Sequence, residues 1–449
     1  MSILTPIIEW LSLPIIIYVL SISIICTIAL RFVQFRYFIK SWKLTLFPEK
    51  ISKDTTQTVD MTPFQAFVNA LSTSLGNGSL AGMATAIYSG GPGAAFWVVV
   101  VGLLTMAIRF CEIFLSTYFR EITPEKSAIG GPMLYLKSVI GGKKLAWLYA
   151  LSCLLYGLIV GCAMQTNSIG ISAVATWGAW GLKPLHVAII LLLFVIYVVI
   201  GGAPRIVALS NKIVPLKVGL FFSTSLILLL YHYNSLFSAL KLILQGAFTP
   251  SALIGGTIGL TIQKAMRVGM LRNINATESG LGTAAIFFGA TGSKKPVESA
   301  IMSMLITFTS TLVCFMICLS IVASGVWNTG LTSTDLTIAA YKTAFGGVAG
   351  WLVSFLSIAF GIGVIVGFVY VSKECWLYIT NKRFGIVFDI LFCALAFIGT
   401  LVHVHIIWDA GDLINAAMLA INLFGILYLL PIIRKKFLEY RKNTKPSSS

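Results

Sequence analysis

The sequence has 449 residues, of which 57% are hydrophobic and only 10% charged, with a formal net charge of +17. Its mean hydropathy of +0.93 is far above that of soluble domains, whose residues are about half apolar. This composition excludes a soluble globular domain and predicts an all-α polytopic membrane protein. The basic excess lies in loops between apolar segments, so it indicates membrane topology and not nucleic-acid binding.

Eleven apolar segments are long enough to cross a hydrocarbon core, which needs roughly 20 residues per helix. We place them near 12–30, 64–89, 93–116, 145–171, 183–200, 212–231, 251–272, 297–325, 347–371, 384–401 and 408–432. The first follows the acidic Glu9 without a small-residue cleavage site, so we predict a retained helix and not a signal peptide. We expect one transmembrane domain over residues 1–449.

Basic residues gather in alternate loops along the chain. The basic loops are 31–53, 117–144, 205–212, the loop after the seventh segment with Arg272, Lys294 and Lys295, and 373–383, followed by the tail 433–449. The intervening loops hold only Lys183, Lys241 and Lys342. By the positive-inside rule, the N-terminus is outside and the C-terminus cytoplasmic in a plasma-membrane protein.

Two segments contain helix-breaking runs at mid-depth. The second segment has Gly76, Asn77, Gly78 and Ser79, and the seventh has Gly255, Gly256 and Thr257. An unwound backbone is tolerated in a bilayer only where protein or a water-filled cavity satisfies it. We therefore expect both breaks to face a cavity, although close packing through small residues also explains the glycines of the second segment.

The two broken segments divide the chain into repeats. With residues 1–60 set aside as an extra N-terminal helix and loop, blocks 61–232 and 250–432 each hold five segments and open with a broken one. An odd number of segments gives the blocks opposite topology, which is the inverted-repeat plan of many secondary transporters. In such proteins half-helix N-termini face an anionic group of the solute, while freed carbonyls coordinate cations.

Several motifs resemble the alanine or glycine:cation symporter family, also called the sodium:alanine symporter family. They cover nearly the whole chain in the family's order. The motifs are "GNGSLAGMATAIYSGGPGAAFW" from residue 76, "GGPMLYL" at 130–136, "MQTNS" at 164–168, "GGAPRI" at 201–206, "IVP" at 213–215, "TESGLGTA" at 277–284 and "DLINAAM" at 412–418.

This resemblance implies a leucine-transporter-like fold of ten core helices plus one, and sodium-driven uptake of small neutral amino acids such as alanine and glycine. It implies that the backbone of Gly76, Asn77 and Gly78 meets the substrate carboxylate. Gln165 would meet the ammonium or frame the pocket, with Thr166 and Asn167 as further candidates. For Gln165, an interhelical hydrogen bond remains an alternative.

The sequence departs from the family pattern at three places. The first is Ser79, which stands where the family has asparagine. The second is the stretch 362–368, in which Phe368 replaces a pocket tryptophan. Gly363 and Val364 replace hydroxyl residues that look like sodium ligands in the family. Sodium needs oxygen ligands, so a cation site formed by Leu75, Gly78, Gly363 and Val364 has a doubtful ligand set.

The third departure is Lys217, which follows Pro215 by two residues where the family is apolar. In one interpretation Lys217 extends to the cytoplasmic interface, as Lys212 does. In the other, its ammonium fills the cation site, as a similarly placed lysine does in proton-coupled or sodium-independent transporters of the same broad fold. An ionisable group within a span is a functional hypothesis by default.

Other classes of function fit the sequence less well. A channel needs a continuous lined pore, whereas the polar groups cluster at mid-depth. An enzyme needs a nucleophile with a base, or metal ligands, at membrane depth, and no such set is evident.

We expect Arg109 to pair with Glu112, and Asp409 and Asp412 to belong to an outer gate. We expect no cofactor, with sodium or a proton as coupling ion, an amino-acid substrate and a monomer.

Overall fold

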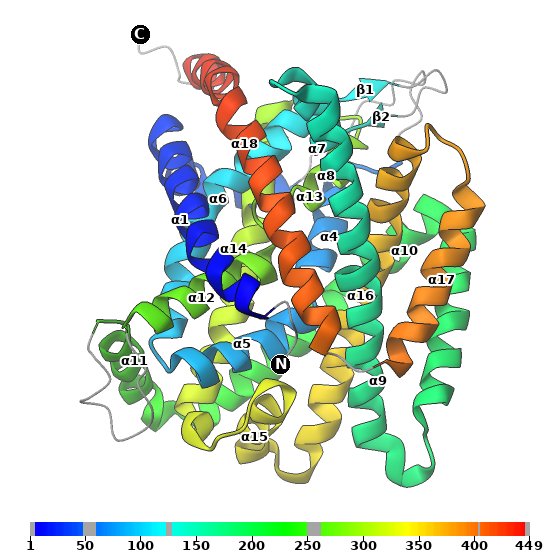
Figure 1. Cartoon of the computed structure of the whole chain (residues 1–449). Helices are drawn as coiled ribbons and strands as arrows, with labels where there is room; N and C mark the ends of the chain where they lie inside the picture. The colour runs from blue at the N-terminus through cyan, green and yellow to red at the C-terminus, as the bar shows by residue number, and fades with distance from the viewer. Residues whose placement is uncertain (1–4, 48–59, 123–127, 249–261, 403–404, 445–449) are drawn as a thin grey trace.

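The computed structural model describes residues 5–47, 60–122, 128–248, 262–402 and 405–444, which are almost entirely helical (Figure 1). The α-helices are α1 (Thr5–Ala29), α2 (Val33–Arg36), α3 (Phe38–Leu46), α4 (Pro63–Ser74), α5 (Asn77–Gly90), α6 (Ala94–Tyr118), α7 (Pro132–Tyr135), α8 (Gly142–Tyr156), α9 (Met164–Trp177), α10 (Pro184–Tyr231), α11 (Tyr233–Phe248), α12 (Ile262–Thr277), α13 (Thr283–Gly289), α14 (Pro296–Ala323), α15 (Ser333–Phe345), α16 (Ala349–Ile379), α17 (Gly385–Leu401) and α18 (His405–Thr444).

Short elements connect these helices. They are the 3₁₀ turns η1 (Leu136–Ser138), η3 (Gly178–Trp180), η5 (Val326–Asn328) and η6 (Gly346–Val348), the π-helical segment η2 (Gly157–Ala163), and the strands β1 (Glu121–Ile122) and β2 (Ala128–Ile129). The strands pair antiparallel, with Glu121 opposite Ile129.

Seven helices of the described residues are long and apolar enough to cross a membrane, and α17 is a shorter apolar helix. The protein is therefore a multi-pass membrane protein. α6 packs along α14, and α16 packs against α4, α9 and α10. Figure 1 shows α18 crossing the front of the bundle beside α1, and these two helices are in contact.

The long helix α10 corrects one predicted boundary. We expected residues 201–211 to link two separate segments; α10 instead consists of two helices that meet at a kink at Gly202, so only the length of the link was wrong. A straight helix of its 48 residues would measure about 72 Å, more than twice the hydrocarbon core. Gly202 bends it with φ 58° and ψ −158°, which glycine adopts without a Cβ penalty, and Pro204 suits the first turn of the second half.

The first predicted break is confirmed. α4 starts at a capping box in which Thr62 and Gln65 exchange hydrogen bonds, with Pro63 at its first position. It ends at Ser74, and α5 starts at Asn77. Leu75 and Gly76 between them have φ/ψ of −101°/79° and −116°/−173°, so the backbone is extended at this point and not helical.

A further break lies in a stretch where we did not predict one, and the break predicted in the seventh segment stays a prediction. Residues Gly255, Gly256 and Thr257 lie outside the described residues. The stretch 273–296, which we expected to be a polar loop, instead contains the end of α12 and all of α13, and both are buried. The helix is broken between them at Glu278–Gly282, where Gly280 and Gly282 have φ of 97° and 83°. The expectation of a polar loop at 273–296 was wrong because buried partners, not water, satisfy these polar residues.

The two broken helices lie beside each other. α5 packs against α12, and α4 packs against α13. In Figure 1, α5 and α12 occupy the lower part of the bundle, and α4 and α13 lie above them. This arrangement brings the gaps Leu75–Gly76 and Glu278–Gly282 to the centre of the molecule.

We predict that Gly289→Ala destabilises the protein. A Cβ at residue 289 would lie 2.2 Å from the Gly130 Cα, where α13 ends against the β2 segment. Overpacking of this kind costs about 1–3 kcal/mol. The measurement is the thermal unfolding midpoint of purified protein in detergent. The matched control is Gly219→Ala in α10, where a Cβ would meet nothing within 4 Å, and equal midpoints for the two variants would contradict the prediction.

Candidate functional site

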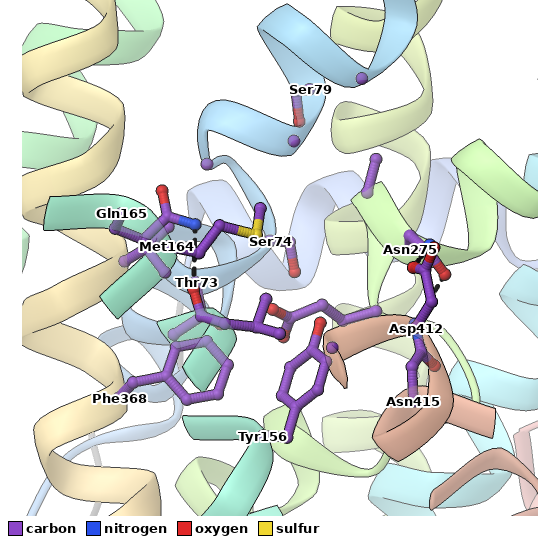
Figure 2. A pocket seen from close by; sticks show the side chains of 18 of the residues that line it. Thr73, Ser74, Ser79, Tyr156, Met164, Gln165, Asn275, Phe368, Asp412 and Asn415 are labelled. Atoms are coloured by element: carbon purple, nitrogen blue, oxygen red, sulfur yellow. Dashed lines mark hydrogen bonds between the residues drawn. The ribbon is translucent and has the colours of Figure 1, made fainter. Parts of the chain in front are cut away.

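A cavity lined by both polar and apolar groups lies between the two breaks (Figure 2). Its empty volume is about 620 Å³, part of it open solvent. Figure 2 shows Met164, Gln165 and Phe368 on one wall, and Asn275, Asp412 and Asn415 on the opposite wall. The lining residues are Thr73, Ser74, Gly76, Gly78, Ser79, Gly82, Tyr156, Val160, Met164, Gln165, Arg272, Asn275, Ala276, Glu278, Val364, Phe368, Gly411, Asp412 and Asn415.

The N-terminus of α5 presents donors to this cavity. A Cβ on Gly78 or Gly82 would meet nothing within 4 Å, so the open space reaches the helix backbone. The Ser79 hydroxyl is buried without a hydrogen bond in the described part of the chain, and the neighbouring Cys314 thiol offers only a weak contact. The positive end of the helix dipole and this unused hydroxyl together suit an anionic group.

Asn77, at the start of α5, holds the broken helix against its neighbours and does not line the cavity. Its backbone N–H and its Nδ2 both donate to Gln165 Oε1, each at 3.3 Å. Ser357 Oγ on α16 donates to Asn77 Oδ1 at 2.8 Å. Gln165 Nε2 donates in turn to the Val160 carbonyl of η2 at 3.2 Å. Gln165 therefore lines the cavity and also makes the interhelical hydrogen bond that we weighed as its alternative role.

Two further candidates on α9 turn away from the cavity. Asn167 Nδ2 donates to the carbonyls of Gly399 at 3.0 Å and Val402 at 2.6 Å, both at the end of α17. Thr166 donates to the Ala163 carbonyl one turn earlier. Neither residue is among those that line the cavity.

Phe368 does line the cavity, and its ring fits against Gly161, where a Cβ would lie 2.3 Å from Phe368 Cγ.

Lys217 belongs to α10 and is fully buried. Its side chain reaches the C-terminal end of α4. Its Nζ donates to the carbonyls of Ser72 at 2.8 Å and Leu75 at 2.9 Å. These carbonyls belong to the last turn of α4, where the helix leaves acceptors without intrahelical partners and the dipole is negative. The ammonium therefore occupies a position suited to a cation and does not extend to an interface.

Gly363 makes room for this ammonium. A Cβ at residue 363 would lie 2.5 Å from Lys217 Nζ and 2.8 Å from Ser72 Oγ. The Gly363 carbonyl accepts a hydrogen bond from Ser72 Oγ at 2.9 Å. Val364 supplies methyl groups and no oxygen, and a Cβ on Gly76 would lie 2.7 Å from Val364 Cγ2. A side-chain oxygen at residue 363 and the lysine could not share this space.

The second break is held by an internal polar network. Arg109 Nη1 pairs with Glu112 Oε2 at 3.1 Å, with both side chains fully buried, as the sequence predicted. Arg109 Nη2 donates to the Thr277 carbonyl at 2.7 Å. Asn422 Nδ2 donates to Glu112 Oε1 at 2.9 Å and to the Gly280 carbonyl at 2.8 Å. The carbonyls freed by this break are thus satisfied by side chains from α6 and α18.

The far wall of the cavity comes from α12 and α18. Asn275 Nδ2 donates to Asp412 Oδ1 at 3.0 Å, and Asn415 Nδ2 donates to Asn275 Oδ1 at 2.6 Å. Arg272 also lines the cavity, so its expected place in a basic loop was wrong. Asp412 was expected at an outer gate, and the side chain of Asp409 lies outside the described ones.

Several residues that line the cavity were not predicted from the sequence. Glu278, Tyr156 and Thr73 all face the cavity. The signal for Glu278 was present in "TESGLGTA", because two glycines within five residues after a helix also mark an unwound segment. Tyr156 carried no comparable signal, because its position depends on the π-helical turn that follows it.

The whole chain, residues 1–449, matches the family model described as the sodium:alanine symporter family. The chain belongs to this family. The sodium:alanine symporter family is a family of transporters. Membership therefore agrees with the cavity at the centre of a membrane-embedded bundle.

Relatives within the sodium:alanine symporter family align over almost the full chain. An uncharacterized transporter of Haemophilus influenzae is 31% identical over 436 residues, covering 96% of this chain and 94% of the relative. The sodium/alanine symporter AgcS of Methanococcus maripaludis is 30% identical over 436 residues, covering 94% of each chain. A putative sodium/proton-dependent alanine carrier protein, YrbD of Bacillus subtilis, is 27% identical over 453 residues, covering 97% and 91%.

Solved structures outside the family share the fold. A Na⁺-coupled sialic acid symporter in its substrate-bound outward-open state superposes with a TM-score of 0.59 at 14% identity, covering 93% of this chain and 86% of that one. A manganese transporter of Eremococcus coleocola gives a TM-score of 0.51 at 15% identity, covering 85% and 78%. These likenesses show a transporter fold and nothing about the solute.

We predict that Gly363→Ala displaces the Lys217 ammonium and destabilises the protein. A hydrogen bond to a charged group contributes about 1.5–3 kcal/mol, and the new methyl group forces the ammonium off at least one carbonyl. The measurement is the thermal unfolding midpoint in detergent. The control is Gly350→Ala on the same helix, where a Cβ would meet nothing within 4 Å. If Gly363→Ala unfolds at the wild-type midpoint, the ammonium is not confined as described.

Proposed function

We propose that the protein is a secondary active transporter that takes up small neutral amino acids of the alanine and glycine type by alternating access. Family membership and the central cavity between two broken helices support this proposal. The cavity is lined by a helix N-terminus, amides and hydroxyls, which suit a small zwitterion. It lies between the broken helices at the centre of the bundle, where alternating access requires the solute site.

We further propose eleven membrane crossings arranged as an inverted repeat. To the seven long helices we add the shorter helix α17 and the broken pairs α4–α5 and α12–α13, whose halves are each too short alone. The part of α10 beyond Gly202 is the eleventh crossing, because α10 is one of the seven and bends into two helices there. Residues 61–232 and 250–432 form the repeats. The loop charges place the N-terminus outside and the C-terminus in the cytoplasm of a plasma membrane.

In this proposal the solute carboxylate binds at the N-terminus of α5. The Gly78 backbone and the unused Ser79 hydroxyl face the cavity there, and no side chain covers Gly78 or Gly82. Ser79 replaces the amide of the family pattern with a shorter donor. The backbone of Gly76 and Gly78 and the Ser79 hydroxyl together would hold a carboxylate, whereas the Asn77 N–H already donates to Gln165. Gln165 would frame the pocket.

The Lys217 ammonium would take the place of a coupling sodium ion. The single observation that carries this is the pair of hydrogen bonds from Lys217 Nζ to the Ser72 and Leu75 carbonyls. A sodium ion at the same carbonyls would need further oxygen ligands, and Gly363 and Val364 bring no side-chain oxygen. We therefore propose uptake that does not depend on sodium, in contrast to the family default of sodium symport.

We predict that uptake of radiolabelled alanine into proteoliposomes is the same with sodium or choline outside. We also predict that Lys217→Ala abolishes uptake, because two buried carbonyls of α4 lose their donor. The control is Lys212→Ala on the same helix, whose side chain is exposed and which should transport normally. An imposed proton gradient reports whether protons drive the cycle.

Sodium-driven uptake that survives Lys217→Ala would contradict the proposal. In that case the lysine would be a structural cap on α4, and sodium would bind through other ligands. If the wild type takes up neither alanine nor glycine, the substrate assignment itself is wrong.

A further inference from the structure

Glu278 is a buried carboxylate that faces the cavity from the second break. It is 4% exposed and lines the cavity. Its backbone has φ 52°, in the left-handed region that residues other than glycine rarely adopt. Such strain persists only where the surrounding structure holds it, and it is concentrated at functional sites. The residue with this strained backbone therefore carries a side chain that faces the cavity.

The segment around Glu278 is held rigidly. On its N-terminal side the Thr277 carbonyl accepts from Arg109. On its C-terminal side the Gly280 carbonyl accepts from Asn422, and the Leu281 carbonyl accepts from Tyr149 OH at 2.6 Å. The carboxylate itself accepts from Thr283 Oγ1 at 2.6 Å, and the Thr73 hydroxyl of α4 lies against it. Glu278 is thus preorganised between the two broken helices.

The Glu278 carboxylate makes no ion pair with any described residue, although Arg272 lines the same cavity and two further cations act on it. Lys217 from α10 and Arg109 from α6 act on it electrostatically. The Lys217 ammonium, however, donates to the Ser72 and Leu75 carbonyls, and Arg109 pairs with Glu112. Tyr156 lines the same cavity and its phenol is close enough to interact electrostatically with the carboxylate. Buried charges are normally paired, so this carboxylate has room for one more positive partner.

We infer that Glu278 binds the ammonium group of the transported amino acid. This inference rests on the proposed function. The carboxylate of the solute would lie at the N-terminus of α5, and its ammonium would lie across the cavity at Glu278. The two broken helices would then each recognise one charge of the zwitterion. A solute with a hydroxyl in place of the amine would leave Glu278 buried and unpaired, so the site would select amino acids over hydroxy acids.

The experiment compares L-alanine with L-lactate, which differ only in the amine and the hydroxyl. Equilibrium binding is measured by calorimetry on the full-length protein in detergent, for wild type, Glu278→Gln and Glu278→Asp. Glutamine keeps the size and the acceptor for Thr283 but removes the charge, whereas aspartate keeps the charge. Glu298→Gln is the matched control, because Glu298 pairs with Lys295 away from the cavity.

We expect wild type to prefer alanine strongly over lactate. Glu278→Gln should weaken alanine binding at least about thirty-fold, the range for removing one partner of a buried charge pair, and should weaken lactate binding much less. Glu278→Asp should retain part of the preference, and Glu298→Gln should bind as wild type does.

Three results would overturn the inference. The first is wild-type alanine affinity in Glu278→Gln. The second is an equal loss of alanine and lactate binding, which would indicate a structural role for the carboxylate. The third is an unfolded Glu278→Gln together with a folded Glu278→Asp that binds the two solutes equally. If wild-type protein binds no amino acid, the proposed function itself has failed, and that result is distinct from the other three.

Discussion

The rest of the structure depends on one constraint: main-chain N–H and carbonyl groups at the break between α4 and α5 lack intrahelical partners. In a membrane these groups have no water to bond to, so protein or solute has to satisfy them. The end of α4 is negative and receives the Lys217 ammonium, whereas the start of α5 is positive and faces the cavity with an unused Ser79 hydroxyl. The break therefore separates a satisfied cation position from an open anion position.

The second break solves the same problem in a different way. Its carbonyls are occupied by Arg109, Asn422 and Tyr149, so this segment is fixed by α6, α18 and α8. What it offers the cavity is a side chain, Glu278, and not free backbone. One broken helix thus presents backbone and the other presents charge, which gives the cavity the two opposite poles that a zwitterion needs.

The sequence predicted much of this fold, and its failures have a common cause. The helical membrane architecture and the first break follow from local composition, because apolar runs and the glycines around Asn77 act within one segment. The break at Glu278–Gly282 was not predicted because "TESGLG" is typical of a polar loop, and only partners distant in sequence show that it is buried. The position of Lys217 was undecided for the same reason. Its burial depends on the absent Cβ of Gly363, which no local pattern reveals.

The most direct test of this account is a calorimetric titration of sodium into the purified wild-type protein, with and without saturating alanine. The account predicts no saturable sodium binding, and the same alanine affinity in sodium and choline salts, because the lysine ammonium already occupies the α4 carbonyls. Saturable sodium binding that tightens alanine binding would contradict it, since an ion would then occupy a site that the structure assigns to Lys217 or one that it does not show.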